Sequence, residues 1–405
     1  MLSTFFNQIG LYLSIALCQI THIGCAYGAE NVAAPAQLAI KLPAGFNINI
    51  YAKLSENDGQ PRMMALDKLG QLYVAMASSN QVLMLPDINK DGVADAPVVI
   101  AKNLNAPNSL VFVNDFLLIA NEDSVVKLTQ KNGVWSKPQS FISNLASGHH
   151  TLKTIKLGPD NHLYINIGSS CNVCVESEPS RATIQRYTLE GKPAGSLVTL
   201  GRHVPDPTWA RGLRNSQGFA WHPKTAAMFA TNNGSDMRSN TKNGKVNDEL
   251  PPEHLNKIEP GKHYGWPYCW ANPDNLQTMI QDPNFVGPDN FCETATPPAM
   301  TFTSHSTPIG MSFLDKTNWP TEYKSDAIVA LHGSWNRQKP SGYKLVRVQF
   351  KADKPAQVSD FATGWLNENN VWGRPIDVIV GADGALYVTD DRAGAIYRIT
   401  YQLNQ

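Results

Sequence analysis

Six short segments of the same design recur along the chain, each a turn followed by a strand that ends in small or polar residues. They lie roughly 45 to 65 residues apart, with one longer gap near residue 280. This period is typical of the four-stranded blades of a β-propeller, in which a single blade cannot bury its apolar face alone. The sequence therefore predicts an all-β fold, a six-bladed β-propeller. The six segments begin at Asp67, Asn114, Gly158, His222, Lys324 and Gly381.

The two ends of the predicted propeller carry matching strand patterns. Residues 46–51 alternate apolar and polar side chains as FNINIY, and residues 396–401 do so as IYRITY. Pairing the N-terminal strand into the last blade would leave neither strand as an open edge. We therefore expect these two strands to lie side by side and close the ring.

The charge balance limits the partners of the chain. The 34 Lys and Arg residues match 34 Asp and Glu residues, and no basic run occurs. Neither nucleic acid nor an anionic membrane surface is therefore an expected partner. A chain of 405 residues with 29 Gly and 27 Pro suits one turn-rich propeller domain, which we place at residues 36–405. No sequence pattern indicates an oligomeric state.

Residues 1–28 differ in character from the rest of the chain. An apolar run from Ile9 to Ile20 precedes small residues near Cys25 and Ala29. This pattern is typical of a secretory signal peptide, and the run is too short to span a membrane comfortably. We therefore expect export to the periplasm or the exterior. The residues before Cys25 also partly resemble a bacterial lipoprotein site, so lipid anchoring is the alternative.

Four cysteines remain once residues 1–28 are set aside. An even count in an exported chain predicts two disulfides, most simply Cys171–Cys174 and Cys269–Cys292. The CNVC segment is followed by Val175 rather than by His, which argues against covalent haem attachment. The other two cysteines are too far apart for a zinc ribbon, so disulfides are the preferred interpretation.

One acidic loop, DINKDGVAD, has the residue types of a calcium site. Oxygen-bearing side chains alternate along it, and Gly92 allows a tight bend. Position twelve is Val98 rather than an acid, which excludes an EF-hand. The loop instead predicts a structural calcium hairpin between two propeller strands, with a solvated acidic turn as the alternative. The expected ligands are the side chains of Asp87, Asn89, Asp91 and Asp95 and the backbone carbonyl of Val93.

Polar residues stand just before or after several of the repeated strands. His150 precedes the third copy, where an imidazole can serve as a general base. Arg214 and Asn215 precede the fourth copy and can clamp an anionic or carbonyl-rich ligand. Arg337 follows the fifth copy, and Arg374 precedes the sixth. Because blade loops converge at the central channel, we expect these side chains to share one site.

Together these segments resemble the soluble pyrroloquinoline quinone (PQQ)-dependent sugar dehydrogenases, and most of all their sorbosone and aldose sugar dehydrogenase-like branch. The resemblance covers about residues 40–402. It implies a six-bladed propeller, exported to the periplasm, that holds the quinone and a calcium ion over its central channel. The motifs that carry it are GHHTLKTIKLGPDNHLYINIGSSCNVC, GLRNSQGFAWHP, HLNKIEPGKHYGWPYCW, HGSWNR and GRPIDVIVGADGALYVTDD.

The same resemblance implies a role for each matching residue. His150 matches the catalytic base, and Arg214 matches a residue that stabilises the developing oxyanion. His150 would take a proton from a sugar hydroxyl or a hydrated aldehyde while a hydride moves to the quinone. The electrons would then pass to an external acceptor such as a periplasmic cytochrome. The implied quinone contacts are Asn215, Arg337, Arg374, His305 and Asn108, and the implied calcium contacts are the backbone carbonyls of Gly234 and Ser235.

One position departs from the glucose-oxidising branch of that family. Ser169 stands where an acidic residue supports the catalytic histidine. Support for His150 is therefore expected from elsewhere, either His149 or Glu249, and glucose becomes a doubtful substrate. A propeller of this kind could also be a calcium-dependent lactonase or a binding scaffold without redox chemistry, because fold does not fix function. A lactonase would centre its metal on carboxylates, whereas the Arg, His and Asn set favours an anionic quinone.

Overall fold

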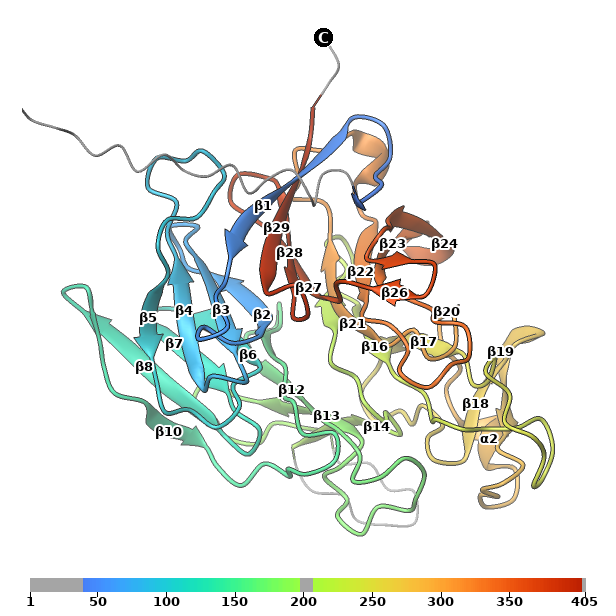
Figure 1. Ribbon diagram of the computed structural model, residues 1–405. Helices are drawn as coiled ribbons and strands as arrows, with labels where there is room; N and C mark the ends of the chain where they lie inside the picture. The colour runs from blue at the N-terminus through green and yellow to red at the C-terminus, as the bar shows by residue number, and fades with distance from the viewer. Residues whose placement is uncertain (1–38, 197–206, 403–405) are drawn as a thin grey trace, which may run out of the picture. The chain divides into compact units, whose positions relative to one another are not determined.

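The computed structural model describes residues 39–196 and 207–402, and their regular structure is almost entirely β-strand (Figure 1). The signal peptide expected at residues 1–28 and the predicted start of the propeller domain at residue 36 lie outside this part. Within the described ranges, no helix has the length and apolar character needed to cross a membrane.

Six antiparallel sheets, each with four main strands, follow one another along the chain (Figure 1). The first consists of β2 (Pro61–Leu66), β3 (Leu72–Met76), β4 (Gln81–Leu85) and β5 (Val98–Ala101). The second consists of β6 (Ser109–Val113), β7 (Phe116–Ala120), β8 (Val125–Lys131) and β10 (Gln139–Ile142), with the short β9 (Val134–Trp135) beside β8. The third consists of β11 (Ile155–Leu157), β12 (Leu163–Ile167), β13 (Thr183–Tyr187) and β14 (Thr208–Arg211).

The remaining three sheets complete the ring. The fourth consists of β15 (Phe219–Trp221), β16 (Met228–Asn232), β17 (Glu253–Ile258) and β20 (Met300–Phe302). The fifth consists of β21 (Pro308–Phe313), β22 (Ala327–Leu331), β23 (Lys344–Lys351) and β24 (Lys354–Ala362). The sixth consists of β27 (Pro375–Val380), β28 (Leu386–Asp390), β29 (Ala395–Tyr401) and β1 (Phe46–Lys53). First strands touch between the first and second, second and third, fourth and fifth, and fifth and sixth sheets, and β2 of the first sheet meets β27 of the sixth. The predicted six-bladed β-propeller is confirmed.

Each repeated segment of the sequence forms the same part of a blade, namely the turn into the second strand and that strand itself. The second strands are β3, β7, β12, β16, β22 and β28. In the first copy the Asp67 carboxylate accepts hydrogen bonds from the backbone N–H groups of Leu69 and Gln71, at 2.8 and 2.9 Å. An Asp at the start of such a turn stabilises it through these bonds. The recurrence therefore reflects one turn chemistry used in several blades.

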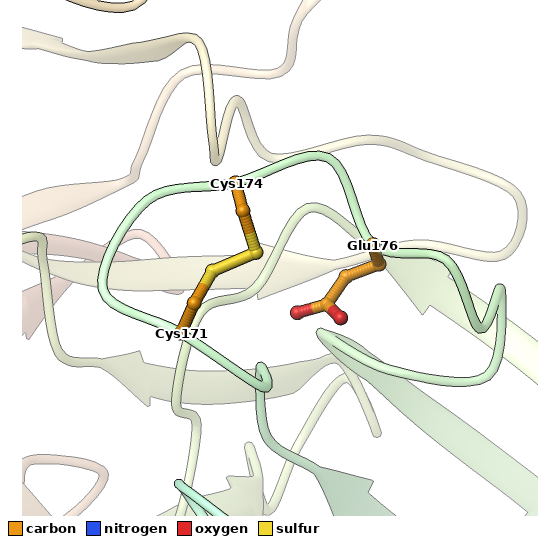
Figure 2. Close-up of side chains that lie close together, drawn as sticks. All are labelled: Cys171, Cys174 and Glu176. Atoms are coloured by element: carbon orange, nitrogen blue, oxygen red, sulfur yellow. A yellow bond between two sulfur atoms is a disulfide. The ribbon is translucent and has the colours of Figure 1, made fainter.

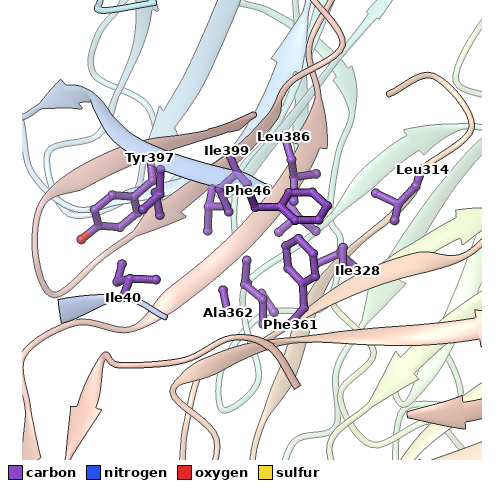
Figure 3. Packing of buried hydrophobic residues seen from close by; sticks show 14 of the residues in the cluster. Ile40, Phe46, Leu314, Ile328, Phe361, Ala362, Leu386, Tyr397 and Ile399 are labelled. Atoms are coloured by element: carbon purple, nitrogen blue, oxygen red, sulfur yellow. The ribbon is translucent and has the colours of Figure 1, made fainter. Parts of the chain in front are cut away.

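The N-terminal strand closes the ring, as predicted. β1 pairs antiparallel with β29, with Phe46 opposite Tyr401 and Ile50 opposite Tyr397. The Phe46 ring lies edge-on to Trp319 and Phe361, with centroid separations of 4.7 and 5.1 Å. Figure 3 shows Phe46 packed among buried side chains of the fifth and sixth blades. Apolar burial therefore stabilises the closure in addition to the strand hydrogen bonds.

The antiparallel order of the strands determines where a site can form. The loop that follows each second strand emerges at the same end of the blade as the loop that leads into its first strand. These two sets of loops include residues 143–154, 168–182, 212–218, 233–252, 303–307 and 332–343. They contain most of the polar residues that the sequence singles out.

The long insertion after β17 has its own small hairpin, formed by β18 (Cys269–Asn272) and β19 (Asn275–Gln281). The short helix α2 (Phe291–Thr294) follows it. A disulfide joins Cys269 to Cys292, and a second joins Cys171 to Cys174 in the loop after β12. Both predicted pairings are confirmed.

The candidate active site

A cavity of about 400 Å³ lies at the end of the blades where these loops emerge. This volume is within the usual range for small-molecule sites. The structure brings together five residues that the sequence predicts for the site, His150, Arg214, Asn215, Gly234 and His305. The other lining residues are His149, Asn172, Asn233, Asp236, Met237, Glu253, Thr307 and Trp335.

His150 has the tautomer and charge that a general base needs. Its Nδ1 atom lies 2.8 Å from the Ser169 hydroxyl, and that hydroxyl donates to the Cys171 carbonyl at 2.7 Å. Because a hydroxyl has only one proton to donate, Ser169 accepts from the Nδ1–H of His150. The Nε2 lone pair is thereby left free. Burial, followed by the charges of Arg214 and His149, lowers the pKa of His150 to about 3, so the ring is neutral near pH 7.

The support for His150 differs from the expectation. We expected His149 or Glu249 to replace the missing acidic residue, but Ser169 itself makes the contact. His149 is a weaker neighbour, with its Nδ1 atom 3.4 Å from that of His150. Glu249 forms an ion pair with Arg337 instead. A serine can replace the acid here because its own proton is already donated to a backbone carbonyl.

Arg214 is held by the loop that carries the first disulfide. Its guanidinium donates to the backbone carbonyl of Asn172 at 3.1 Å and to the Asn172 side-chain oxygen at 2.9 Å. It also pairs with Asp236 at 2.8 Å. Asn172 lies within the four-residue ring closed by Cys171–Cys174, whose bond is visible in Figure 2. The disulfide ring thus contacts both His150, through Ser169, and Arg214.

Two acidic side chains also line the cavity. Burial raises the pKa of Glu253 to about 7, although its carboxylate accepts the Gly234 N–H at 2.5 Å. Burial alone would also raise the pKa of Asp236, but hydrogen bonding to His305 and the Arg214 charge lower it overall. Asp236 in turn raises the pKa of His305, against the effect of burial, so that ring carries positive charge more readily. The cavity therefore combines cationic and anionic groups.

Two buried amide oxygens in the cavity lack partners. The side-chain oxygens of Asn215 and Asn233 accept no hydrogen bond. Unpaired buried polar atoms are uncommon and indicate a missing partner such as an ion. Oxygen ligands from amides, carboxylates and backbone carbonyls are those that Ca²⁺ prefers. The residues around Gly234 therefore fit a hard cation, with Asp236 and Glu253 as additional donors.

Three of the predicted quinone contacts lie outside the cavity lining. Arg337 pairs with Glu249 and donates to the Ser304 carbonyl. Arg374 pairs with Asp391 at 2.9 Å. Asn108 is fully buried, where its oxygen accepts from Arg62 at 2.9 Å.

The contacts of Arg374 and Asn108 belong to one charged network within the ring. Arg62 and Arg374 both contact Asp391, and His332 does so as well. Arg374 therefore belongs to this network and not to the lining of the cavity.

The predicted calcium hairpin forms an exposed loop between β4 and β5. Asp87 accepts from the N–H groups of Asp91 and Gly92 at 3.1 and 3.0 Å, and Asp95 accepts from Ile88 at 2.9 Å. The carboxylates thus organise the turn through hydrogen bonds to its backbone. Val93 is half exposed.

Among the described residues, Cys171, Cys174 and Glu176 form the only group of three His, Cys, Asp or Glu side chains close enough together to share a metal ion. Their two sulfurs are bonded to each other, so these atoms are not a metal site (Figure 2).

Sequence reasoning did not assign roles to Asn172, Asp236, Glu253 and Trp335. Asn172 lies between the two cysteines of CNVC, and Asp236 directly follows the predicted calcium residues. Both positions could have been found from those motifs. Trp335 belongs to the HGSWNR motif, but its side chain is 70% exposed, which no sequence signal indicates. Glu253 is the first residue of β17, and nothing in the sequence marks it.

The fold and the cavity define a six-bladed propeller with a polar ligand site at one end of its blades. The chain belongs to the TrAA12-like family, whose model matches residues 40–402. Its predicted resemblance to the PQQ-dependent sugar dehydrogenases is thereby confirmed at the level of the family.

Individual relatives agree with this assignment. An uncharacterized protein of Borreliella burgdorferi is 27% identical over 383 residues, which cover 90% of this chain and 91% of that protein. A PQQ-dependent pyranose dehydrogenase of Coprinopsis cinerea is 25% identical over 305 residues, 64% of this chain but only 41% of the fungal protein. The holo PQQ domain of a Coprinopsis cinerea pyranose dehydrogenase has a similar fold, with a TM-score of 0.75, 21% identity and coverage of 89% and 97%.

Proposed function

We propose that the chain is a quinoprotein oxidoreductase that oxidises a sugar or a sugar aldehyde with PQQ as its cofactor. The observation that carries this proposal is the neutral His150, with a free Nε2 atom, in a cavity beside Arg214. Homologues named as PQQ-dependent pyranose dehydrogenases support the cofactor and the substrate class.

The residues of the cavity fit this cofactor and a calcium ion. Arg214 and His305 provide positive charge for the carboxylates and carbonyls of the quinone. The free amide oxygens of Asn215 and Asn233 and the backbone at Gly234 would hold the cation. Arg337 and Arg374 do not line the cavity, so we assign neither of them to the quinone.

Each residue has a distinct part in the proposed reaction. When bound, the quinone supplies the two-electron oxidising chemistry, and an external acceptor such as a cytochrome removes the electrons. His150 takes the proton of the substrate hydroxyl at Nε2 while Ser169 holds the opposite side of the ring. Arg214 keeps a fixed position through Asn172 and Asp236 and stabilises negative charge near it. Trp335, exposed at the cavity, offers a flat surface for a sugar ring.

Export and the second calcium site are also part of the proposal. Two disulfides support an oxidising compartment, the periplasm or the exterior. The exposed hairpin of Asp87, Asp91 and Asp95 would bind calcium in a structural role, since it lies between β4 and β5 and not among the residues that line the cavity.

A calcium-dependent hydrolase such as a lactonase is the second candidate. The observation in its favour is that the cavity contains Asp236 and Glu253 beside two unpaired amide oxygens, a donor set that holds calcium without any quinone. Such an enzyme would hydrolyse lactones with calcium alone and would gain nothing from PQQ.

Reconstitution distinguishes the two candidates. The purified chain, stripped with a chelator, would be titrated with PQQ and calcium and assayed for dye reduction with a panel of aldoses and aldehydes. The same preparation with calcium alone would be assayed on lactones. His150→Ala should retain quinone binding and lose dye reduction, whereas His149→Ala, at the adjacent histidine, should retain both. Lactone hydrolysis without quinone turnover would favour the hydrolase.

A further inference from the structure

A second cavity, of about 430 Å³, lies beside the candidate active site. We call it the aromatic pocket, after Trp266, Tyr268 and Phe291 in its lining. Trp266 links the two cavities, because its indole N–H donates at 3.1 Å to the same Asn172 carbonyl that holds Arg214. None of the residues assigned to the proposed reaction lines this pocket.

The pocket contains Arg211, a cation that forms no ion pair with any described residue. The Nε and Nη2 atoms of Arg211 are buried and make no hydrogen bond, and within the described part of the chain no acidic residue pairs with it. Burial lowers the pKa of this guanidinium. Arg211 as a whole is partly buried, and a charge that is partly removed from water is stabilised by an opposite charge beside it.

Among the described residues, no neighbouring side chain forms an ion pair with Arg211. Burial, followed by the Arg211 charge, lowers the pKa of His263 to about 3, so its ring is neutral near pH 7. Glu176 also lines the pocket, where its carboxylate accepts the N–H and the hydroxyl of Ser170 at 2.7 Å, and it forms no ion pair with Arg211. Figure 2 shows Glu176 beside the Cys171–Cys174 bond. The guanidinium is therefore open to an anionic ligand.

The aromatic walls are rigidly held. The rings of Tyr268 and Phe291 meet edge-on with their centroids 5.1 Å apart. Each of these residues directly precedes a cysteine of the Cys269–Cys292 disulfide, which fixes one wall relative to the other. A preformed pocket loses little conformational entropy when it binds a ligand.

We propose that the aromatic pocket is a binding site for a ring that carries a carboxylate, with the carboxylate on Arg211 and the ring against Tyr268 and Phe291. Guanidinium groups match carboxylates in geometry, and aromatic side chains bind flat rings or the apolar faces of sugar rings. Both aromatic acids and uronic acid residues of saccharides have this chemistry. The site is independent of the proposed quinone reaction.

Isothermal titration of the purified chain tests the proposal. The probes are 2-naphthoate, its uncharged analogue 2-naphthamide, and D-glucuronate with D-glucose as its uncharged counterpart. At least one of the two carboxylates should bind about 10-fold or more tightly than its neutral counterpart. The neutral compound cannot form the charge-assisted hydrogen bonds with Arg211. Which acid binds identifies an aromatic or a saccharide ligand.

Variants locate the binding. Arg211→Gln should weaken binding of the carboxylate about 10-fold or more. Arg211→Lys, which keeps the charge, should lose less affinity. Arg181→Gln is the matched control, because Arg181 lines the same pocket but already pairs with Glu178. It should bind as the unaltered chain does. If neither acid binds better than its neutral counterpart, or if Arg211→Gln binds equally well, the proposal is wrong.

Discussion

Removing the Ser169 hydroxyl should impair His150 as a general base while ligands still bind in the cavity. In Ser169→Ala, the Nδ1–H of His150 and the Cys171 carbonyl would both lose their partner in a region where Ser169 is fully buried. An unmet buried hydrogen bond costs about 1–3 kcal/mol, which corresponds to a fall in kcat of about 5- to 150-fold. The loss arises because the imidazole can then protonate Nε2 and no longer accept the substrate proton.

Two measurements check this prediction. Steady-state kinetics of the reconstituted enzyme should show the loss in kcat rather than in KM. Nitrogen NMR of the apoprotein should show His150 protonated at Nδ1 in the unaltered chain and a mixture of tautomers in Ser169→Ala. Ser170→Ala is the matched control, because that hydroxyl contacts Glu176 and not His150. A normal kcat together with an unchanged tautomer in Ser169→Ala would refute the reasoning.

Three further predictions follow from the buried polar groups. Glu253 has a folded pKa of about 7, above its unfolded value, because it is buried. The apoprotein should therefore lose about 3 kcal/mol of stability as pH rises from about 4.5 to 7. Denaturation of Glu253→Gln should not show this dependence of stability on pH. Asn172→Ala removes the side-chain oxygen that accepts from Arg214 but keeps the backbone carbonyl contact, and should weaken quinone binding about 10-fold, measured by absorbance titration, with little change in Tm. Asp391→Asn leaves the buried Arg62 without its counter-charge and should lower the free energy of unfolding by about 3–5 kcal/mol in urea melts, while activity per folded molecule persists.

The sequence predicted the architecture well because that architecture repeats. The turn at Asp67 has counterparts in other blades, and the alternating pattern at Phe46 is visible without any partner. His150 and Arg214 were found because they stand next to repeated strands. Both disulfides followed from the even number of cysteines.

The ion pairs of the site could not be predicted in the same way. Whether Arg374 faces a ligand or an acid depends on Asp391, and Arg337 depends on Glu249 from another blade. Such pairings depend on three-dimensional positions and not on spacing along the chain. The role of Ser169 was missed for a related reason, since it requires knowing that its proton is donated to the Cys171 carbonyl.

The most direct test of the account is a titration of the chelator-stripped chain with PQQ and calcium, followed by single-turnover reduction with an aldose or sugar aldehyde. We expect stoichiometric, calcium-dependent quinone binding and a rate of quinone reduction that His150→Ala abolishes while binding persists. Failure of the quinone to bind, or equal reduction by His150→Ala, would contradict the central claim.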